Sequence, residues 1–381
     1  MNKIYKLINQ FKHYEWGSLN KLPEFLNLTD YKNLPYAEMW MGTHPGACSQ
    51  AVLDDKNVNL DSICGPLPIL LKILAVDSPL SIQAHPNKEQ AKSGFEKENE
   101  SALSLKAPTR NYKDPNHKPE ILCALSPFTL MAGFRETISI QKNLEELLIT
   151  APFLKDIIQP LFSSLGEGSL SSFFCALNNL SNIEREYLTA FILENNNEKE
   201  DGIISCEQWN LMKNFAKQYP GDIAIISPLY LNLLKLEKGQ AVYIPDGILH
   251  SYIKGFGIEL MTSSDNVLRG GLTHKHVDIN ELINILHFVP FLPQIITPPL
   301  HTQWFYYHSM YDDFTLACMK NKEEAKTFAH DGPAICLVTE GFLKTEEQCF
   351  NKGESFVIAQ NTPNVILDGD FTLYAAIPGK K

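Results

Sequence analysis

Two well-separated stretches of this chain repeat one pattern of lysine, glycine and apolar residues, and this repeat limits the folds that the chain can adopt. Residues 238–244 read KGQAVYI and residues 352–358 read KGESFVI, and a further glycine follows sixteen residues after the first glycine of each copy. An apolar run behind a glycine turn is typical of a β-strand, so the repeat indicates two copies of one β unit. Short repeated strands of this kind suit double-sheet jelly rolls, and we expect two such barrels.

The other apolar residues change their spacing along the chain. Up to about Phe134, short apolar runs are broken by Gly, Pro, Asn and Asp, as in strands, and a helix is predicted at 88–100. Between 137 and 219 apolar residues recur at helical spacing, and from Ile223 the strand pattern resumes. The sequence therefore predicts a mainly β fold of two jelly-roll barrels with an inserted α-helical domain, divided as residues 1–136 plus 222–288, residues 137–221 and residues 289–381.

Composition and charge exclude several classes of partner. The 381 residues carry a formal net charge of −11, which argues against nucleic acid or an anionic membrane because such partners select a basic surface. The eight cysteines form no Cys-x-x-Cys pair and sit mostly among apolar neighbours, as reduced core cysteines do. Charges interrupt residues 1–17, and no apolar run reaches membrane-spanning length, so we expect a cytoplasmic protein.

Three short segments offer side chains that could bind a metal ion. They read SIQAHP at 81–86, NHKPE at 116–120 and PDGILH at 245–250. Side chains alternate along a strand, so Gln83 and His85, two residues apart, can point to the same place. Two imidazoles, a carboxylate and an amide oxygen suit zinc or a similar divalent ion in a catalytic site. The sequence therefore predicts a metal site formed by Gln83, His85, Glu120 and His250.

Each of these four residues also has a simpler explanation. Gln83 and His85 could be polar residues on the outer face of a strand, but a proline ends that strand after a mostly apolar stretch. Glu120 leads into an apolar run, where an unpaired carboxylate would be strongly penalised. A lone histidine such as His250 is more often a core residue with satisfied hydrogen bonds. The second copy of the repeat has Asn364 at the equivalent position, so we expect one active barrel and one without metal.

A glycine-flanked segment, residues 257–271, carries further polar side chains. It includes Glu259, Asp265 and Arg269. Glycines let a backbone approach a ligand closely, and an arginine beside them suits a phosphate or a developing oxyanion. The alternative from spacing alone is an exposed loop with solvated charges.

Several lysines are candidate cations for an anionic ligand. Lys72 lies within an otherwise apolar strand, where a lone ammonium needs an anionic partner. Lys88 and Lys118 are further candidates, although lysines are common on protein surfaces. Residues 274–276, which read His-Lys-His, have the spacing of a metal pair, but no nearby acid or cysteine completes it, and we expect a solvated turn there.

Taken in order along the chain, these segments resemble the type I mannose-6-phosphate isomerases, also called phosphomannose isomerases, of the cupin superfamily. The resemblance rests on YEWG at 14–17, AEMWMGTHP at 37–45, SIQAHP, NHKPE, and SDNVLRGGLT at 264–273. It spans nearly the whole chain and is least specific in the C-terminal barrel. One departure is visible, because relatives often have Thr-Pro-Lys where this chain has Thr273, His274 and Lys275.

The resemblance implies a fold, a cofactor and a set of site residues. The fold is a zinc jelly roll with a helical insert and a second jelly roll, and the cofactor is one zinc ion per chain, with the ligands Gln83, His85, Glu120 and His250. The catalytic candidates are Arg269, Lys118 and Glu259. By the resemblance, Lys72, Ser81, Tyr252 and Asp265, with Lys118 and Glu259, fall on the pocket that meets the sugar phosphate. Independently of the resemblance, we add Lys88 and His117 to the residues expected to bind substrate. The implied activity is the reversible conversion of mannose 6-phosphate and fructose 6-phosphate in the cytoplasm, and we expect a monomer.

This activity requires the sugar to open, lose a proton from C2, pass through an enediol and regain a proton at C1. A metal can polarise the oxygens at C1 and C2, and Arg269 is our candidate for stabilising the enediolate. Lys118 or Glu259 would act as the base, because burial beside a metal can tune either pKa towards neutrality, and the sequence does not decide between them. His117 could assist ring opening.

Two alternatives stay open on sequence alone. A metal-dependent cupin oxygenase would use iron with the same two histidines and carboxylate, although Gln83 as a fourth ligand and the cationic pocket argue against it. A non-catalytic sugar-phosphate-binding cupin would keep the fold without the chemistry. The presence of Arg269, Lys118 and all four ligands disfavours that alternative.

Overall fold

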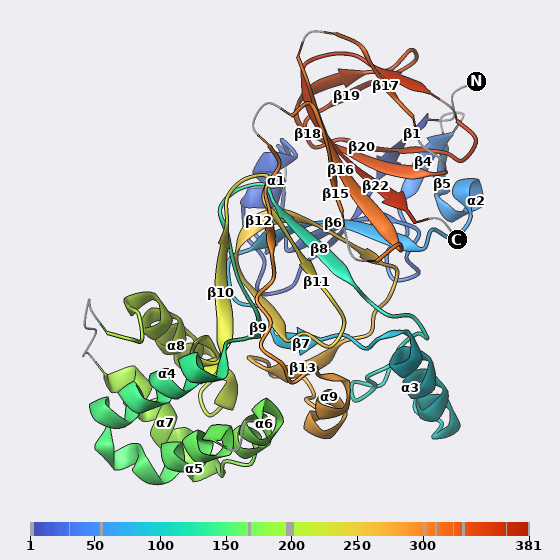
Figure 1. Cartoon of the computed structure of the whole chain (residues 1–381). Coiled ribbons are helices and arrows are strands. Elements are labelled where there is room, and N and C mark those ends of the chain that lie inside the picture. The colour runs from blue at the N-terminus through green and yellow to red at the C-terminus, as the bar shows by residue number, and fades with distance from the viewer. Residues whose placement is uncertain are drawn as a thin grey trace.

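The protein is mainly β, with antiparallel sheets and a group of helices at one end (Figure 1). The computed structural model describes residues 4–29, 31–53, 56–166, 169–195, 202–299, 302–308, 311–322, 324–329, 332–362 and 364–379. Across these ranges, none of the helices has the length and apolar content needed to traverse a lipid bilayer.

The larger sheet carries the segments with predicted metal ligands. Its main path runs β14-β11-β8-β12-β6-β3-β2, with β7 and β9 attached to β12, β10 to β9 and β13 to β7. Its strands are β2 (Gln10–Lys12), β3 (Glu38–Gly42), β6 (Ile69–Val76), β7 (Ile82–Ala84), β8 (Glu120–Ala124), β9 (Phe128–Phe134), β10 (Leu231–Leu236), β11 (Ala241–Ile244), β12 (His250–Thr262), β13 (Leu268–Gly271) and β14 (Ile295–Ile296).

The long strand β12 joins the two halves of this sheet. Its first residues pair with β7 and β9, and its later residues pair with β6 and β8. At Gly255 the backbone φ is +155°, and a Cβ there would lie 2.3 Å from Phe128 Cδ2. Only glycine fits this close approach, at the point where β12 passes from one set of partners to the other. The strand therefore carries both His250, at its start, and Glu259, which pairs with β6 and β8 further along.

The second sheet combines strands from both ends of the chain. Its path runs β15-β16-β22-β18-β20-β1-β4-β5, with β19 beside β18 and a separate β17-β21 pair. The strands are β1 (Ile4–Ile8), β4 (Gln50–Leu53), β5 (Lys56–Asn59), β15 (Trp304–Tyr307), β16 (Phe314–Asn321), β17 (Lys326–Phe328), β18 (Ala334–Lys344), β19 (Cys349–Asn351), β20 (Ser355–Ile358), β21 (Val365–Leu367) and β22 (Phe371–Pro378).

A shared apolar core joins the two sheets. Ile73, Ile121 and Ile258 of the first sheet cluster with Leu316 and Val357 of the second, and each is fully buried. Burial of this apolar surface stabilises the contact between the sheets. The jelly-roll connectivity and the three-domain division stay predictions. One detail of that division differs in the structure, because β1 pairs with β20 and residues 4–8 therefore belong to the sheet of the C-terminal part.

The two copies of the sequence repeat adopt one local structure. Gly239 and Gly353 both have φ +87°, a conformation that glycine adopts without strain, and each turn leads into a strand, β11 or β20. The position of His250 in the first copy falls on Asn364 in the second, which has a left-handed φ of 51°. The repeated glycine turn therefore starts a strand in both halves, as its sequence predicts.

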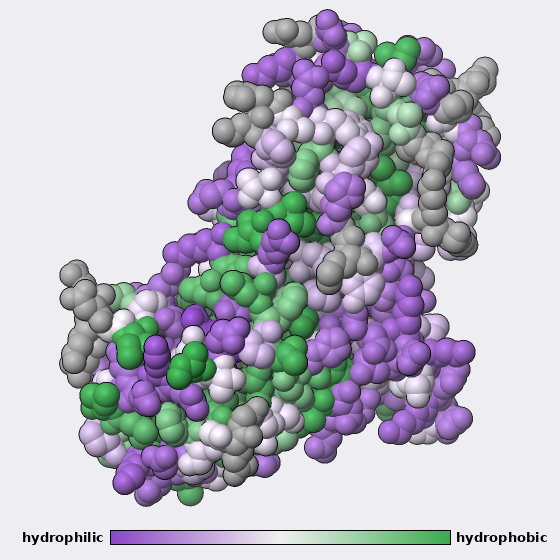
Figure 2. Space-filling view, viewed as in Figure 1, coloured by the Kyte–Doolittle hydropathy of each residue, from purple (hydrophilic) through white to green (hydrophobic). Residues whose placement is uncertain are grey.

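Helices occur where the 3.6-residue spacing predicts them. They are α4 (Thr137–Thr150), α5 (Lys155–Gly166), α6 (Leu170–Asn178), α7 (Asn182–Glu194) and α8 (Cys206–Gln218), with the 3-10 turn η1 (Pro152–Leu154). The strand predicted from Ile223 is wrong for its first residues, because Asp222 caps a 3-10 helix, η2 (Ile223–Leu229), and β10 begins only at Leu231. Ser181 and Ser205 form capping boxes that begin α7 and α8. Phe173 and Phe174 pack onto the sheet through Tyr230 and Phe134. Figure 2 shows apolar side chains on the surface of this helical part, which exposes Ile138, Ile149, Phe153, Ile183 and Tyr187.

Other helices lie outside this group. They are α1 (Lys21–Phe25), α2 (Asp61–Cys64), α3 (Lys88–Glu100) and α9 (Ile279–Ile285). The helix predicted at 88–100 is α3, which begins with a capping box between Asn87 and Gln90 immediately after the β7 segment. Its start fixes where the chain turns away from His85.

Candidate metal centre and active-site cavity

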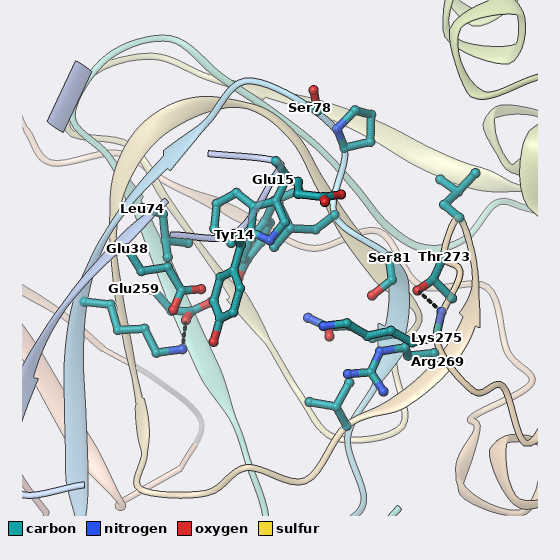
Figure 3. Close-up of a pocket in the computed structure, with 18 of the residues that line it drawn as sticks. Tyr14, Glu15, Glu38, Leu74, Ser78, Ser81, Glu259, Arg269, Thr273 and Lys275 are labelled. Carbon is teal, nitrogen blue, oxygen red and sulfur yellow. Dashed lines mark hydrogen bonds and ion pairs between the residues drawn. The ribbon is translucent and has the colours of Figure 1, made fainter. Parts of the chain in front are cut away.

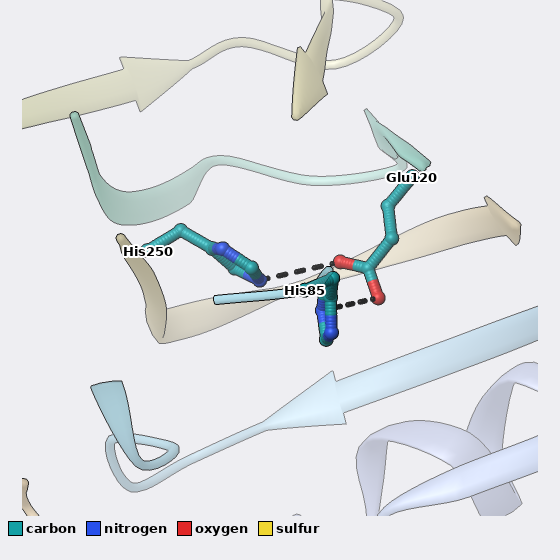
Figure 4. A group of neighbouring side chains, drawn as sticks. All are labelled: His85, Glu120 and His250. Atoms are coloured by element: carbon teal, nitrogen blue, oxygen red, sulfur yellow. Dashed lines mark ion pairs between the residues drawn. The ribbon is translucent and has the colours of Figure 1, made fainter. Parts of the chain in front are cut away.

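His85, Glu120 and His250 converge on one point inside the larger sheet (Figure 4). One ligand atom from each lies within 4.8 Å of the others, and all three side chains are buried. His85 Nε2 is 3.2 Å from Glu120 Oε1, and His250 Nε2 is 3.3 Å from Glu120 Oε2. The three residues follow β7, begin β8 and begin β12. Strand ends from three distant parts of the chain therefore form one cluster.

The second nitrogen of each imidazole fixes where its proton lies. His85 Nδ1 is 2.7 Å from the Asn266 carbonyl oxygen, and His250 Nδ1 is 2.9 Å from the Ile248 carbonyl oxygen. A carbonyl only accepts, so both Nδ1 atoms carry the proton and both Nε2 lone pairs point towards Glu120. Burial, followed by the nearby Lys118, lowers the pKa of His85 to about 4 and keeps its imidazole neutral.

The atoms that face one another in this cluster are all acceptors. Among the described residues, neither His85 Nε2 nor Glu120 Oε1 has a hydrogen-bond partner. A buried acceptor without a donor costs about 1–3 kcal/mol, and two opposed acceptors are stabilised by a cation between them. Two neutral imidazoles and a carboxylate are ordinary zinc ligands. The cluster therefore fits a divalent metal ion.

Gln83 and Lys118 lie beside the cluster. Gln83 Nε2 is 3.4 Å from His250 Nε2, and rotation of the amide would turn its oxygen to the same side. Lys118 Nζ is 2.9 Å from Glu120 Oε1, an ion pair without hydrogen-bond geometry. Although burial disfavours the charge of Glu120, Lys118 and the two imidazoles hold the pKa of this carboxyl well below its usual value. Gln83 as a fourth ligand stays a prediction.

A cavity of about 820 Å³ opens next to the cluster (Figure 3). Most predicted site residues line it, namely Lys72, Ser81, Gln83, Lys118, Glu120, Tyr252, Glu259, Asp265 and Arg269. His85 and His250 lie behind this wall. Lys88 and His117 are placed elsewhere, since Lys88 Nζ is 3.3 Å and His117 Nε2 is 3.0 Å from Asp313 Oδ1. Within the described part of the chain, the structure thus does not bring these two residues to the cavity.

A buried network of hydrogen bonds joins the cavity wall to the metal cluster. Lys72 Nζ donates to Glu259 Oε2 at 2.9 Å, and the Tyr252 hydroxyl donates to Glu120 Oε2 at 3.2 Å. Burial and the charge of Glu120 raise the pKa of Glu259, while Lys72 opposes this effect. Glu259 is therefore a buried carboxylate whose proton affinity is increased, as a general base requires.

The strand β13 places Arg269 opposite Gln83 in its pairing with β7. Arg269 and Lys275 lie together on one side of the cavity in Figure 3, and Glu38 and Glu259 lie on the other. Burial, followed by the charges of Arg269 and Lys113, lowers the pKa of Lys275. The cavity thus has a cationic side although the whole chain is acidic.

The sequence analysis missed several residues of this wall. They are Tyr14, Trp16, Glu38, Trp40, Lys113, Thr273, His274 and Lys275. Residues 274–276 are exposed, as expected for a solvated turn, and from this turn His274 and Lys275 also line the cavity, where Lys275 Nζ lies 5.7 Å from the Tyr14 ring. A usable signal existed for Glu38, because a charge inside the apolar stretch 37–41 needs a partner, as argued for Lys72.

The fold and the site together define an antiparallel β protein with a buried histidine and carboxylate metal centre at the wall of a polar, cation-bearing cavity. The family description "Phosphomannose isomerase type I, catalytic domain" matches residues 4–137. The mannose-6-phosphate isomerase of Escherichia coli (strain K12) is 33% identical over 96% of this chain and 97% of that protein. The human mannose-6-phosphate isomerase is 31% identical over 89% of this chain and 88% of that protein. The chain therefore belongs to the type I mannose-6-phosphate isomerase family.

Solved structures of this family superpose closely on the chain. A zinc-bound mannose 6-phosphate isomerase has a TM-score of 0.87 and 31% identity, covering 99% of this chain and 100% of that one. The enzyme of Salmonella typhimurium, bound to substrate (f6p) and zinc, has a TM-score of 0.88 with the same identity and coverage. The resemblance that the sequence motifs carry is confirmed, and so is the mainly β fold.

Proposed function

We propose that this protein catalyses the reversible isomerisation of D-mannose 6-phosphate and D-fructose 6-phosphate with one zinc ion per chain. The observation that carries the proposal is the cluster of His85, Glu120 and His250 at the wall of the cavity, in which His85 Nε2 and Glu120 Oε1 face each other without a hydrogen-bond donor. Family members of known structure contain zinc, and one contains the substrate (f6p). His85, Glu120 and His250, with Gln83 as the fourth ligand, would hold the ion, which when bound stabilises negative charge on a substrate oxygen.

Glu259 is the proposed base. The reaction moves a proton between C2 and C1 of the open sugar, so one group must reach both carbons. Glu259 lines the cavity, its pKa is raised by burial and by Glu120, and Lys72 holds its carboxylate from one side. Lys118, the other candidate, ion-pairs with the metal-binding carboxylate of Glu120, and we assign it to electrostatic stabilisation.

The cations of the cavity divide between the two charged parts of the substrate. Arg269 lies opposite Gln83 in the sheet and is assigned to the enediolate that develops next to the metal centre. Lys275 and Lys113 interact electrostatically on the same side of the cavity and are assigned to the phosphate. We assign the binding of the sugar hydroxyls to the remaining polar groups of the wall, which are Lys72, Ser81, Tyr252 and Asp265.

The proposal also covers the partners of the enzyme, its oligomeric state, its location and its metabolic role. The net charge of −11 supports a small anionic substrate in a local cationic pocket rather than nucleic acid or a membrane as partner. A cytoplasmic monomer is proposed, built as the three predicted units 1–136 plus 222–288, 137–221 and 289–381, except that residues 4–8 pair into the sheet of the C-terminal unit. A role in mannose metabolism, including the supply of GDP-mannose, is proposed with it.

A coupled assay for fructose 6-phosphate formation from mannose 6-phosphate, with and without chelator, tests the function. We expect turnover that chelator abolishes and added zinc restores. A sugar-phosphate-binding protein without catalysis would bind the substrate and give no turnover with zinc present. A cupin oxygenase would consume oxygen with iron and leave mannose 6-phosphate unisomerised. Either result would reject the isomerase.

A further inference from the structure

A short segment of the C-terminal part, residues 311–313, lies against the part of the chain that forms the metal centre. Asp313 Oδ1 is 3.0 Å from His117 Nε2 and 3.3 Å from Lys88 Nζ. The Tyr311 hydroxyl donates a hydrogen bond to Asp246 Oδ1. Lys88, His117 and Asp246 are far apart in sequence. Residues 311–313, here called the strap, therefore connect three separate segments of the chain.

The residues that the strap contacts share one property, which is closeness to a metal ligand in the sequence. Lys88 follows His85 by three residues, His117 precedes Glu120 by three, and Asp246 precedes His250 by four. The strap therefore touches every one of the three segments that supply the histidine and glutamate ligands.

The three contacts differ in how exposed their side chains are to solvent. His117 and Asp246 are buried, at 5% and 7% exposure, whereas the Lys88 side chain is 69% exposed. An exposed ion pair contributes little, about 0–1 kcal/mol, so the Lys88 contact is secondary. Asp313 itself is 20% exposed. The contact between Asp313 and His117 and the hydrogen bond from Tyr311 to Asp246 are therefore the main connections between the strap and the ligand segments.

The contacted side chains are firmly joined to the ligands through the backbone. Gly247, next to Asp246, donates its N–H to the His85 carbonyl oxygen at 2.8 Å. The Thr262 hydroxyl donates to the His117 carbonyl oxygen at 2.6 Å, which ties the segment before Glu120 to the end of β12. A displacement of either contacted residue would therefore move a ligand.

The other side of the strap is anchored to the second sheet. The Gly379 N–H donates to the Asp313 carbonyl oxygen at 2.7 Å, directly after β22, and Asp313 leads into β16. The Tyr311 ring packs 5.4 Å from the Tyr243 ring on β11 and 6.1 Å from the His117 ring. The strap thus connects the C-terminal sheet to the residues next to the metal ligands.

We propose that the strap, through Tyr311 and Asp313, is a positioning element that holds the three ligand segments in the geometry that binds the metal ion. This inference rests on the proposed zinc site and gives the C-terminal part of the chain a role in it. It also gives His117 and Lys88 a role that the cavity does not offer them. Groups that orient metal ligands from behind typically change metal affinity by about 10–100-fold when they are removed.

The test compares zinc binding by Tyr311→Phe, Asp313→Asn, the double variant and wild type, by competition with a chromophoric chelator and by the rate of zinc loss to excess chelator. Asp312→Asn is the matched control, because Asp312 is the adjacent, exposed residue and loses the same charge. We expect the double variant to bind zinc about 10–100-fold more weakly and to lose it faster, with the control equal to wild type.

A second readout separates positioning from a general loss of structure. At saturating zinc the double variant should regain the wild-type kcat, which a variant with a generally disrupted structure would not do. A double variant that holds zinc as tightly as the Asp312→Asn control would overturn the inference and leave the proposed function standing. Wild-type protein that takes up no zinc would overturn both.

Discussion

Lys72 on β6 and Glu259 on β12 are directly opposed in the antiparallel register, and Lys72 Nζ lies 2.9 Å from Glu259 Oε2. Both side chains are buried, with exposures of 7% and 5%. Although burial disfavours the Lys72 charge, Glu259 and then Glu38 raise its pKa above the usual value. Burial, followed by the charge of Glu120, raises the pKa of Glu259. The pair therefore has a firmly charged lysine beside a carboxylate that takes up a proton more readily than usual.

Lys72→Met should shift the pH dependence of activity and lower stability. Lys72 opposes the increase in the Glu259 pKa, so its loss raises that pKa further and moves the acidic limb of the kcat/KM profile to higher pH. Breaking a buried pair costs about 3–5 kcal/mol at neutral pH. Because the pKa of Glu259 is raised in the folded protein, its ionised form destabilises the fold, and this penalty disappears as the pH falls and the carboxyl is protonated. The loss of unfolding free energy in Lys72→Met, measured with urea, should therefore shrink towards pH 4.5. An unmoved acidic limb would contradict this assignment.

Glu259→Gln should lower kcat by about 10²–10⁴-fold, the usual contribution of a general base. The amide keeps the shape of the side chain and loses its proton affinity. Bound zinc should be unchanged, because Glu259 is outside the cluster of His85, Glu120 and His250. Exchange of the C2 hydrogen with solvent gives the decisive measurement. Retained exchange in Glu259→Gln, together with its loss in Lys118→Gln, would assign the base to Lys118 instead.

Glu120→Ala should lose zinc and activity together. Glu120 bridges both imidazoles, so its removal takes away a ligand and the anion that draws the cation into the site. Metal analysis and the coupled assay check both losses, with Glu89→Ala on the exposed side of α3 as control. Wild-type protein at a free zinc concentration of about 100 Kd should be stabilised by about 2.7 kcal/mol over the metal-free form, and Glu120→Ala should not respond. Full activity in this variant would falsify the ligand assignment.

The metal cluster could be predicted because its signals are local. Two-residue spacing placed Gln83 and His85 on one side of a strand, and a carboxylate at the start of an apolar run marked Glu120. The helices between 137 and 219 were likewise predicted from spacing within the segment itself.

Other features depend on contacts that local spacing does not determine. The pairing of β1 with β20 joins residues from the two ends of the chain, and no local pattern specifies such a partner. Lys88 and His117 were assigned to the substrate because cations and imidazoles suit a phosphate, but each faces Asp313 instead. Lys275 was expected in solvent because the turn is polar, and it is exposed, but local spacing did not show that the fold also brings this turn beside the cavity. In each case the tertiary partner decides the role.

The loop after Arg269 supplies the last prediction, which concerns Asp222. Its carboxylate accepts hydrogen bonds from the backbone N–H groups of Ala224, at 2.9 Å, and Thr273, at 3.4 Å. Leu272, directly before Thr273, has a left-handed φ of 52°, which a leucine adopts only when its surroundings hold it there. Asp222 therefore fixes the turn that connects Arg269 to Lys275, from a position where helix α8 has just ended.

Asp222→Ala should let this turn relax and misplace the cationic side of the cavity. We expect KM to rise and kcat to fall, zinc content to stay normal, and stability to drop by about 1–3 kcal/mol, the cost of leaving buried donors unpaired. Asp222→Asn should be much milder, because the amide oxygen still accepts and the charge that burial makes costly, as its raised pKa shows, is gone. Steady-state kinetics, metal analysis and urea unfolding of both variants check this. Equal activity of Asp222→Ala and wild type would mean that the turn holds Arg269 in place without Asp222.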